Sequence, residues 1–172
     1  MGIGHYLFGF SGRINRAKIW LFLLIVIIYF AILVATVFSV VGLDTLQAVA
    51  KHQATSAAIG ARLATAGIAV ALLGLGDLVL IFCGFAVATK RLHDRNKSAW
   101  WLLVFFMLPF ALNMVRFASM MAALQAQGPL PVDPVGTLAG GAALLINLWA
   151  FVELYCLRGT IGDNRFGPDP LA

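Results

Sequence analysis

The chain has 172 residues, of which 62% are hydrophobic and only 11% are charged, and its mean hydropathy is +0.95. A soluble monomer of this size could not keep so much apolar surface out of water, so the composition excludes an ordinary soluble domain. The net charge of +5 is compatible with nucleic-acid binding. The cations border apolar runs, however, which favours membrane topology and attraction to anionic lipid headgroups. We therefore expect no nucleic-acid partner.

A polar and aromatic lead, residues 1–18, precedes the first apolar run. Ser11 or Asn15 could cap a short interfacial helix that runs into this run, and Trp20 stands where an interfacial anchor is expected. The run is longer than about twenty residues, whereas the apolar region of a signal peptide has about 7–15 residues. We therefore expect it to be the first transmembrane helix.

Four apolar runs in total have the length of a membrane span, since a helix needs about 20 apolar residues to cross the hydrocarbon core. The first outer connection is Ala-rich, and its Asp44–Arg62 stretch could extend the flanking helices. The second holds Gly128-Pro129 and Asp133-Pro134, which are typical of loops. The spans are expected at residues 19–41, 67–88, 100–121 and 137–157.

The basic residues predict the orientation of these spans. Of twelve Lys and Arg, three precede the first run, four lie between the second and third, and two follow the fourth. Only Lys51, Arg62 and Arg116 fall on the other side of the alternating path. Basic residues that flank spans stay preferentially in the cytoplasm, so both termini are expected there. The fold class is then all-α: a single integral-membrane four-helix bundle over residues 1–172, with a short interfacial N-terminal segment and cytoplasmic cap motifs.

Cysteine and histidine do not indicate a metal or cofactor. Cys83 and Cys156 both fall inside expected spans, where a small apolar packing role is the ordinary one. The three histidines lie in separate segments without the spacing of a zinc site. We expect no metal and no cofactor.

Three polar segments on the expected cytoplasmic side form a signature in chain order. The first runs from Phe10 to Arg16, with Trp20 beyond it, and the second runs from Lys90 to Trp101, with Pro109 beyond. The third is Gly159 to Pro170. They resemble the bacterial inner-membrane family catalogued as "domain of unknown function 805". Its members join a Gly-Arg-x-x-Arg entry, an Arg-Leu-His-Asp loop before paired Trp, and a Gly-x-Asn-Arg-aromatic-Gly-Pro tail.

The resemblance covers residues 10–170. The chain departs from the pattern in the outer segment around Lys51–Arg62, which looks like an insertion, and in Arg95, where a small or polar residue is expected. The resemblance implies a multi-pass protein of the bacterial inner (cytoplasmic) membrane. It implies no activity.

The candidate site on the cytoplasmic side combines cationic and anionic side chains from all three motifs. Arginine can hold a carboxylate or a phosphate with both arms of its fork. The charges could pair with one another as a membrane-surface cap, or bind an anionic ligand or a protein partner. We expect the motifs to fold together, with at least one arginine of the first motif within hydrogen-bonding distance of the loop or tail. Asp163 and Asp169 in the tail carry charge opposite to Arg13, Arg16 and Arg91. The site residues are Arg13, Arg16, Arg91, His93, Asp94, Asp163, Asn164 and Arg165.

A second set of candidates lies within the spans: Asp77, Asn113, Arg116, Asn147 and Glu153. An unpaired carboxylate at mid-membrane costs about 2.5–3.5 kcal/mol on insertion scales, so Asp77 is a functional candidate. Arg116 is expected to pair with it, because the Arg side chain could span their difference in depth. Glu153 lies about a turn from the cytoplasmic end and can reach the interface.

The leading hypothesis is a non-enzymatic inner-membrane protein that binds a protein partner or anionic lipid through its cytoplasmic motif face. Membrane lipids and either a membrane-protein partner or a second copy of the chain are the expected partners. The alternative is a small transporter, channel or accessory subunit that uses Asp77. An enzyme ranks third, because His93 and Asp94 are consecutive and point about 100° apart on a helix, and no recognisable nucleophile motif accompanies them.

Overall fold

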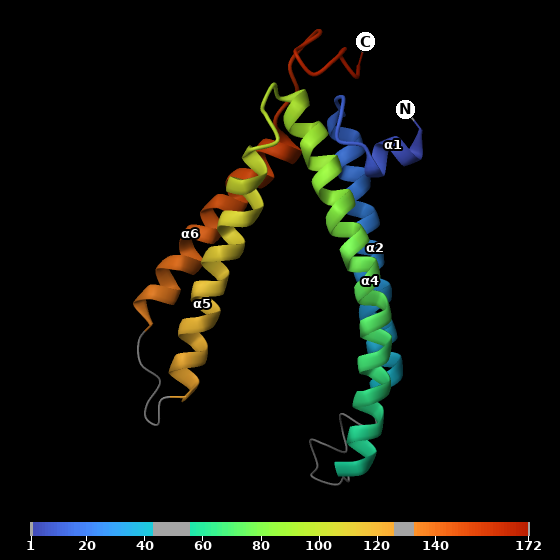
Figure 1. Ribbon diagram of the computed structural model, residues 1–172, viewed down its shortest axis with the longest axis vertical. Helices are drawn as coiled ribbons and strands as arrows, with labels where there is room; N and C mark the ends of the chain where they lie inside the picture. Colours follow the sequence, from blue (N-terminus) through green and yellow to red (C-terminus); the bar gives the residue numbers. More distant parts are fainter. Residues whose placement is uncertain (1, 43–55, 126–132, 172) are drawn as a thin grey trace. The chain divides into compact units, whose positions relative to one another are not determined.

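The computed structural model describes residues 2–42, 56–125 and 133–171. Within these ranges every regular element is helical, which confirms the all-α class (Figure 1). The elements are α1 (Ile3–Phe8), α2 (Arg16–Val41), α4 (Ser56–Asp94), η1 (Leu103–Met107), α5 (Leu108–Gln125), α6 (Pro134–Phe151) and η2 (Val152–Cys156), where η marks a single π-helical turn.

Four helical stretches are long and apolar enough to cross a membrane, as expected: Arg16–Ser39, Leu73–Asp94, Leu103–Ala123 and Pro134–Cys156. The expected second span, residues 67–88, is shifted, because α4 continues as far as Asp94. The Arg-Leu-His-Asp motif is therefore the last turn of α4 and not a loop. Nothing in Lys90–Asp94 breaks a helix, and the chain turns only at Asn96, whose φ of 55° suits asparagine.

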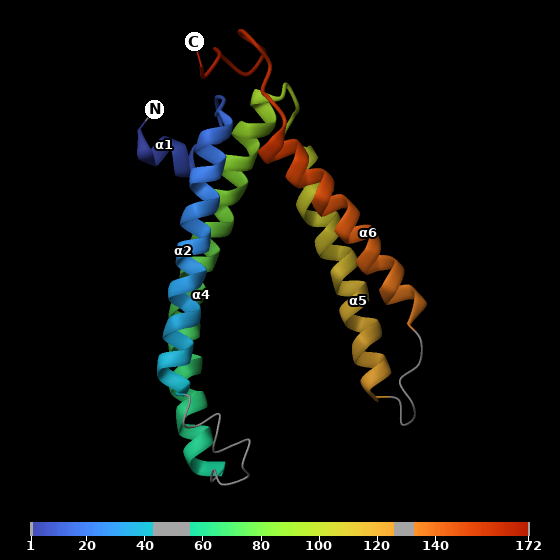
Figure 2. The same cartoon turned by 180° about the vertical axis from the view of Figure 1, so that it is seen from behind.

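Residues 21–84 form one compact unit. The parts of α2 and α4 within it lie side by side (Figures 1 and 2). Tyr29 on α2 donates its hydroxyl to the carbonyl of Leu73 on α4. A Cβ atom at Gly76 would lie 2.7 Å from the Tyr29 hydroxyl, so the glycine leaves the room that this ring needs. A small residue thus lets two membrane helices approach closely.

Residues 1–20 and 85–172 form the other unit. In it, α5 and α6 pack against each other along their length (Figure 2). Phe105 lies 5.1 Å from Trp149 between ring centroids, and Trp101 lies 5.5 Å from the same Trp. At the start of α6, the Asp133 carboxylate accepts the backbone N–H of Gly136 at 2.8 Å, which lowers the pKa of Asp133. Asp133 is thus the N-cap of α6, with Pro134 at the first helical position.

The interfacial lead contains a separate short helix. We expected Ser11 or Asn15 to cap a short helix that enters the first span. In the structure the short helix is α1, which ends upstream of both residues. Asn15 caps α2 itself, since its Oδ1 accepts the backbone N–H of Lys18 at 3.1 Å and α2 begins at Arg16. Trp20 donates its indole N–H to the Tyr155 carbonyl at 3.2 Å, so the start of α2 is fixed to the end of η2.

Candidate functional site: a polar cap built from three motifs

One buried arginine joins the three motifs into a single structure, which we call the cap (residues 10–16, 90–97 and 159–170). Arg13 is only 6% exposed. Its Nε and Nη2 donate to Asp94 Oδ1 at 3.2 and 3.1 Å. The same guanidinium donates to the carbonyls of Thr160 and Gly162, both at 2.7 Å, and of Gly167 at 3.1 Å. The expected bond from an arginine of the first motif to the helix end and tail is therefore present.

Asp94 lies between two buried arginines. Arg91, with no exposed surface, donates Nη1 to Asp94 Oδ2. Its other donors are taken by main-chain carbonyls, that of Leu154 at 2.8 Å and that of Leu157. A buried carboxylate with two charged partners avoids the large cost of an unpaired buried charge. The arrangement also fixes the end of α4 to the end of η2.

Lys90 ties α1 to the cap, a role that the motif analysis missed. This lysine is fully buried, and its ammonium donates to the carbonyls of His5, Tyr6 and Gly9 at 2.8, 2.6 and 2.5 Å. Three ammonium protons thus satisfy three carbonyls at the end of a six-residue helix. The only sequence signal for this role is that Lys90 stands one residue before Arg91 and four before Asp94. The partners of Lys90 are main-chain atoms, which have no sequence signature.

Glu153 belongs to the same polar region. It is only 4% exposed, whereas its position near a span end predicted a side chain that reaches the interface. Its Oε1 accepts from Arg95 Nε at 3.0 Å and from Lys97 Nζ at 2.8 Å. Arg95, the departure from the family pattern, therefore pairs with the acid that the π-helical turn η2 carries. Such turns often occur at functional sites.

The tail folds onto the end of α4 through Asn164 and Phe166. The Asn164 amide donates to the His93 carbonyl at 2.9 Å and to the Thr160 hydroxyl at 2.8 Å. The Phe166 ring stacks on the His93 imidazole with centroids 3.9 Å apart, and His93 Nδ1 lies 3.3 Å from the Gly12 carbonyl. His93 is thus in contact with both other motifs.

The remaining motif residues lie nearer the surface. Arg16 is exposed and donates Nη1 to the Cys156 carbonyl at 3.1 Å. Arg165 donates to the Asn96 carbonyl at 3.1 Å. The hydrogen bonds of the two tail acids go to the backbone: Asp163 accepts the N–H of Asp169, and Asp169 accepts those of Leu171 and Gly162. Asp94 is the acid that accepts hydrogen bonds from Arg13 and Arg91, while the charge of Arg13 acts on Asp169 without a hydrogen bond.

Among the described residues of the unit that holds Asn113, Arg116 and Asn147, no hydrogen bond or ion pair joins these three candidates. Asn113 donates to the Pro109 carbonyl of its own helix at 2.8 Å, and Asn147 is exposed on α6. The Arg116 side chain lies over Gly140, with its Cδ 3.1 Å from where a Cβ would be. Asp77 belongs to the residue 21–84 unit, and its Oδ1 is buried without a hydrogen-bond partner among the described residues. The pairing of Asp77 with Arg116 stays a prediction.

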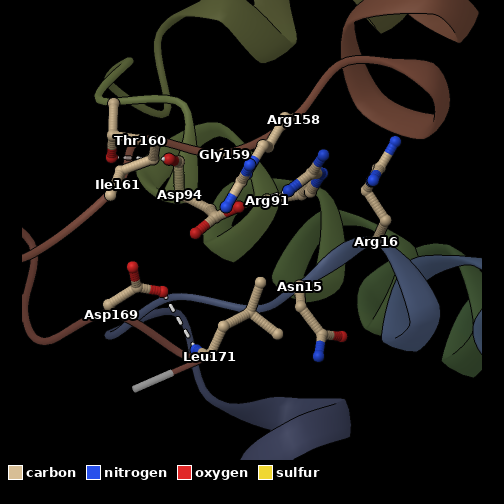
Figure 3. Close-up of a pocket in the computed structure, with 10 residues that line it drawn as sticks. All are labelled: Asn15, Arg16, Arg91, Asp94, Arg158, Gly159, Thr160, Ile161, Asp169 and Leu171. Atoms are coloured by element: carbon tan, nitrogen blue, oxygen red, sulfur yellow. Dashed lines mark hydrogen bonds and ion pairs between the residues drawn. The ribbon is translucent and has the colours of Figure 1, made fainter.

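A cavity of about 270 Å³ opens beside the buried arginines (Figure 3). We call it the arginine cavity. Arg16 enters it from the start of α2, Arg91 and Asp94 from the end of α4, and Arg158 from the segment that follows η2. Its lining residues are Asn15, Arg16, Arg91, Asp94, Arg158, Gly159, Thr160, Ile161, Asp169 and Leu171. In the part of the chain that the structure describes, no three His, Cys, Asp or Glu side chains group as metal ligands would.

Comparison with known proteins identifies the family. The family described as "Protein of unknown function (DUF805)" matches residues 7–168, and the chain belongs to it. The chain is 28% identical to the inner membrane protein YhaH of Escherichia coli (strain K12), covering 94% of this chain and 87% of YhaH. It is 26% identical to the inner membrane protein YhaI of the same organism, covering 94% of this chain and 86% of YhaI. No solved structure matches the chain.

These relatives and the four membrane-capable helices establish a multi-pass protein of the bacterial inner membrane. The matched residues include the first two motifs of the cap and the third as far as Pro168.

Proposed function

We propose that this protein is a non-enzymatic inner-membrane protein whose cap binds anionic lipid headgroups or a membrane-protein partner. The observation that carries the proposal is that the charged side chains of the cap, together with Arg158 just before the tail motif, fall into a buried group and an exposed group. Arg13, Lys90, Arg91 and Asp94 are buried and bonded inside the protein. Arg16 and Arg158 are exposed at its surface. The buried charges hold a fixed scaffold, and the exposed ones are available to a partner.

The basic-residue asymmetry supports a cytoplasmic cap. The inner leaflet of such a membrane is rich in anionic lipid, and each Lys or Arg near that surface is worth about 1 kcal/mol of attraction. Arg16 begins one span, and Arg158 follows another by two residues. Both therefore stand at the depth of the lipid headgroups, which favours lipid among the two kinds of partner.

The test is purification of the full chain from its native membrane in mild detergent, with mass spectrometry of the lipids and proteins that co-purify. An anionic lipid or one stoichiometric protein should be enriched with the wild type and with Asp163→Asn, an exposed position in the tail. It should be lost with Asp94→Asn, which removes the acid between Arg13 and Arg91. Circular dichroism checks that the spans stay helical in each variant. Recovery of lipid in bulk proportions with no enriched protein would contradict the proposal.

A transporter or channel is the second candidate function, and Asp77 favours it. The Asp77 Oδ1 is buried without a hydrogen-bond partner in the described part of the chain. Intramembrane acids commonly serve proton or cation pathways. Purified protein in liposomes should then carry protons or monovalent cations, and Asp77→Asn should abolish the flux. The same flux in liposomes without protein would remove this candidate.

A further inference from the structure

The arginine cavity contains two cationic side chains whose donors are largely unused. Arg158 is exposed, and its side chain donates no hydrogen bond to any residue in the described ranges 2–42, 56–125 and 133–171. Arg16 donates one, from Nη1 to the Cys156 carbonyl at 3.1 Å. A guanidinium offers five N–H donors. The two side chains therefore present several donors to the cavity that they line.

Among the described residues, neither of the two acids that line the cavity accepts a hydrogen bond from Arg16 or Arg158. Asp94 is occupied by Arg13 and Arg91. Asp169 accepts the backbone N–H groups of Gly162 at 2.8 Å and of Leu171 at 2.9 Å. With three arginines and two aspartates in the lining, the cavity keeps a positive charge. An anion that accepts hydrogen bonds from both Arg16 and Arg158 would balance this charge. A phosphate suits the site, because the planar guanidinium group of arginine can donate two parallel hydrogen bonds to phosphate oxygens.

The position of the cavity relative to the membrane indicates that the anion is the phosphate of a lipid. Arg16 is the first residue of the span Arg16–Ser39, and Arg158 follows the end of the span Pro134–Cys156. The ends of spans lie at the level of the lipid phosphates. Asn15 and Arg16, at the start of α2, line the cavity, and the positive end of a helix dipole favours a nearby anion. A phosphate of the surrounding lipid thus reaches this site without leaving the headgroup layer.

Size and rim chemistry favour a headgroup attached to apolar chains. The cavity, at about 270 Å³, is just below the range of about 300–1,000 Å³ for drug-sized ligands. Its rim includes Ile161 and Leu171, which are 78% and 66% exposed. Resting on the proposed function, we propose that the arginine cavity binds the phosphate of an anionic phospholipid, held by Arg16 and Arg158, with Ile161 and Leu171 against its apolar part.

The test uses the full chain in a neutral detergent, titrated by calorimetry with dioctanoyl-phosphatidylglycerol, dioctanoyl-phosphatidylcholine or inorganic phosphate. The phosphatidylglycerol should bind tightest. Arg16→Gln and Arg158→Gln should each weaken it about tenfold or more, because each removes charge-assisted hydrogen bonds. The matched control is Lys18→Gln, which removes one positive charge near the start of the same span as Arg16 but outside the cap and the lining of the cavity. It should bind as the wild type does.

Thermal unfolding of each variant shows whether it is folded. If Arg158→Gln does not fold, Arg158→Lys is used in its place. It keeps the charge without the fork, so it should bind between the wild type and the Gln variant. Wild-type binding of phosphatidylglycerol by the Arg16→Gln, Arg158→Gln double variant would overturn the cavity site. The proposed function would then survive if anionic lipid or a protein still co-purified. Inorganic phosphate binding as tightly as phosphatidylglycerol would overturn the assignment to lipid.

Discussion

Gly159 lies against the carboxylate of Asp94, closer than any side chain there would permit. A Cβ atom added at Gly159 would overlap the Asp94 Oδ2. Gly159→Ala must therefore move either the tail or the acid that Arg13 and Arg91 share, and we expect it to destabilise the protein by about 1–3 kcal/mol, as overpacking does. Thermal unfolding in detergent measures this. The control is Gly141→Ala on α6, where a Cβ meets nothing within 4 Å. Equal melting temperatures for the two variants would contradict the crowding.

Asp94 balances two buried guanidinium groups, so its charge should matter more than that of any exposed acid in the cap. Asp94→Asn leaves Arg13 and Arg91 buried near each other without a counter-charge. Removing one partner of a buried ion pair costs about 3–5 kcal/mol, and we expect a loss of this order in the free energy of unfolding. Asp163→Asn, at an exposed position, should change it by less than about 1 kcal/mol. A similar loss of unfolding free energy in both variants would show that the ion pairs of Asp94 with Arg13 and Arg91 contribute no more than an exposed acid does.

At the residue scale, the sequence predicted which residues form the cap better than which of them contact one another. Arg13, Arg91 and Asp94 could be selected because they belong to the motifs that carry the family resemblance. Their partners could not, because the Arg13 guanidinium bonds mainly to carbonyls of the tail, which have no sequence signature. The same holds for Lys90 and the carbonyls of α1. Main-chain acceptors become specific only once the fold places them.

Helix α1 has only six residues, too few to be stable alone, so its stability must come from its contacts. Lys90 supplies three hydrogen bonds to its last carbonyls and to Gly9, and its ammonium lies 5.9 Å from the centre of the Tyr6 ring. We expect Lys90→Met to unfold α1 while the spans remain intact. Faster hydrogen exchange of the amides of residues 3–9 would show this. Lys97→Met removes a lysine that pairs with Glu153 instead and should leave these amides unchanged.

The tail is closed by Asp169, and its closure should depend on pH. The backbone N–H groups of Leu171 and Gly162 lower the pKa of the Asp169 carboxyl. A lowered pKa means that the charged form stabilises the folded tail above the unfolded pKa of about 3.9, and that this contribution is lost as pH falls through the lower folded value. The Gly162 amide should thus stay protected from exchange to below pH 4 and then open. In Asp169→Asn its protection should not change over this pH range; an unchanged transition there would assign it to another acid.

Elements that depend on local composition were predicted well. Each expected span contains apolar residues over a full membrane thickness, and a span helix appears in each place. The second span is predicted to end at residue 88, whereas α4 continues to Asp94, because polar residues do not by themselves stop a helix. Lys90 and Arg91 are good helix formers that continue it to Asp94. Their charged groups are met by carbonyls of α1 and η2 and by Asp94, which Arg13 also contacts. Tertiary partners, not hydropathy, decide where such a helix ends.

The whole molecule has one property on which the proposed function depends, its orientation in the membrane. Nine of the twelve basic residues flank spans on one predicted side, including those of all three cap motifs. The rule that such residues stay in the cytoplasm then places the cap there. The burial of Arg13, Lys90 and Arg91 does not weaken this inference, because the rule acts on the chain as it inserts and before the cap folds.

Single cysteines test the orientation directly. In a variant with Cys83 and Cys156 replaced by alanine, cysteines at Thr55 and Gln127, which lie outside the described residues, should react with a membrane-impermeant maleimide added to whole cells with a permeabilised outer membrane. On the cap side, Asn96 has a positive φ and Asn164 is held by two hydrogen bonds, so Ile161 and Asp163, both exposed, are the better positions. Cysteines there should react only after the inner membrane is disrupted. Labelling of Ile161→Cys in intact cells, with Thr55→Cys protected, would place the cap outside, away from the anionic inner leaflet and with the opposite charge asymmetry to the one the sequence predicts.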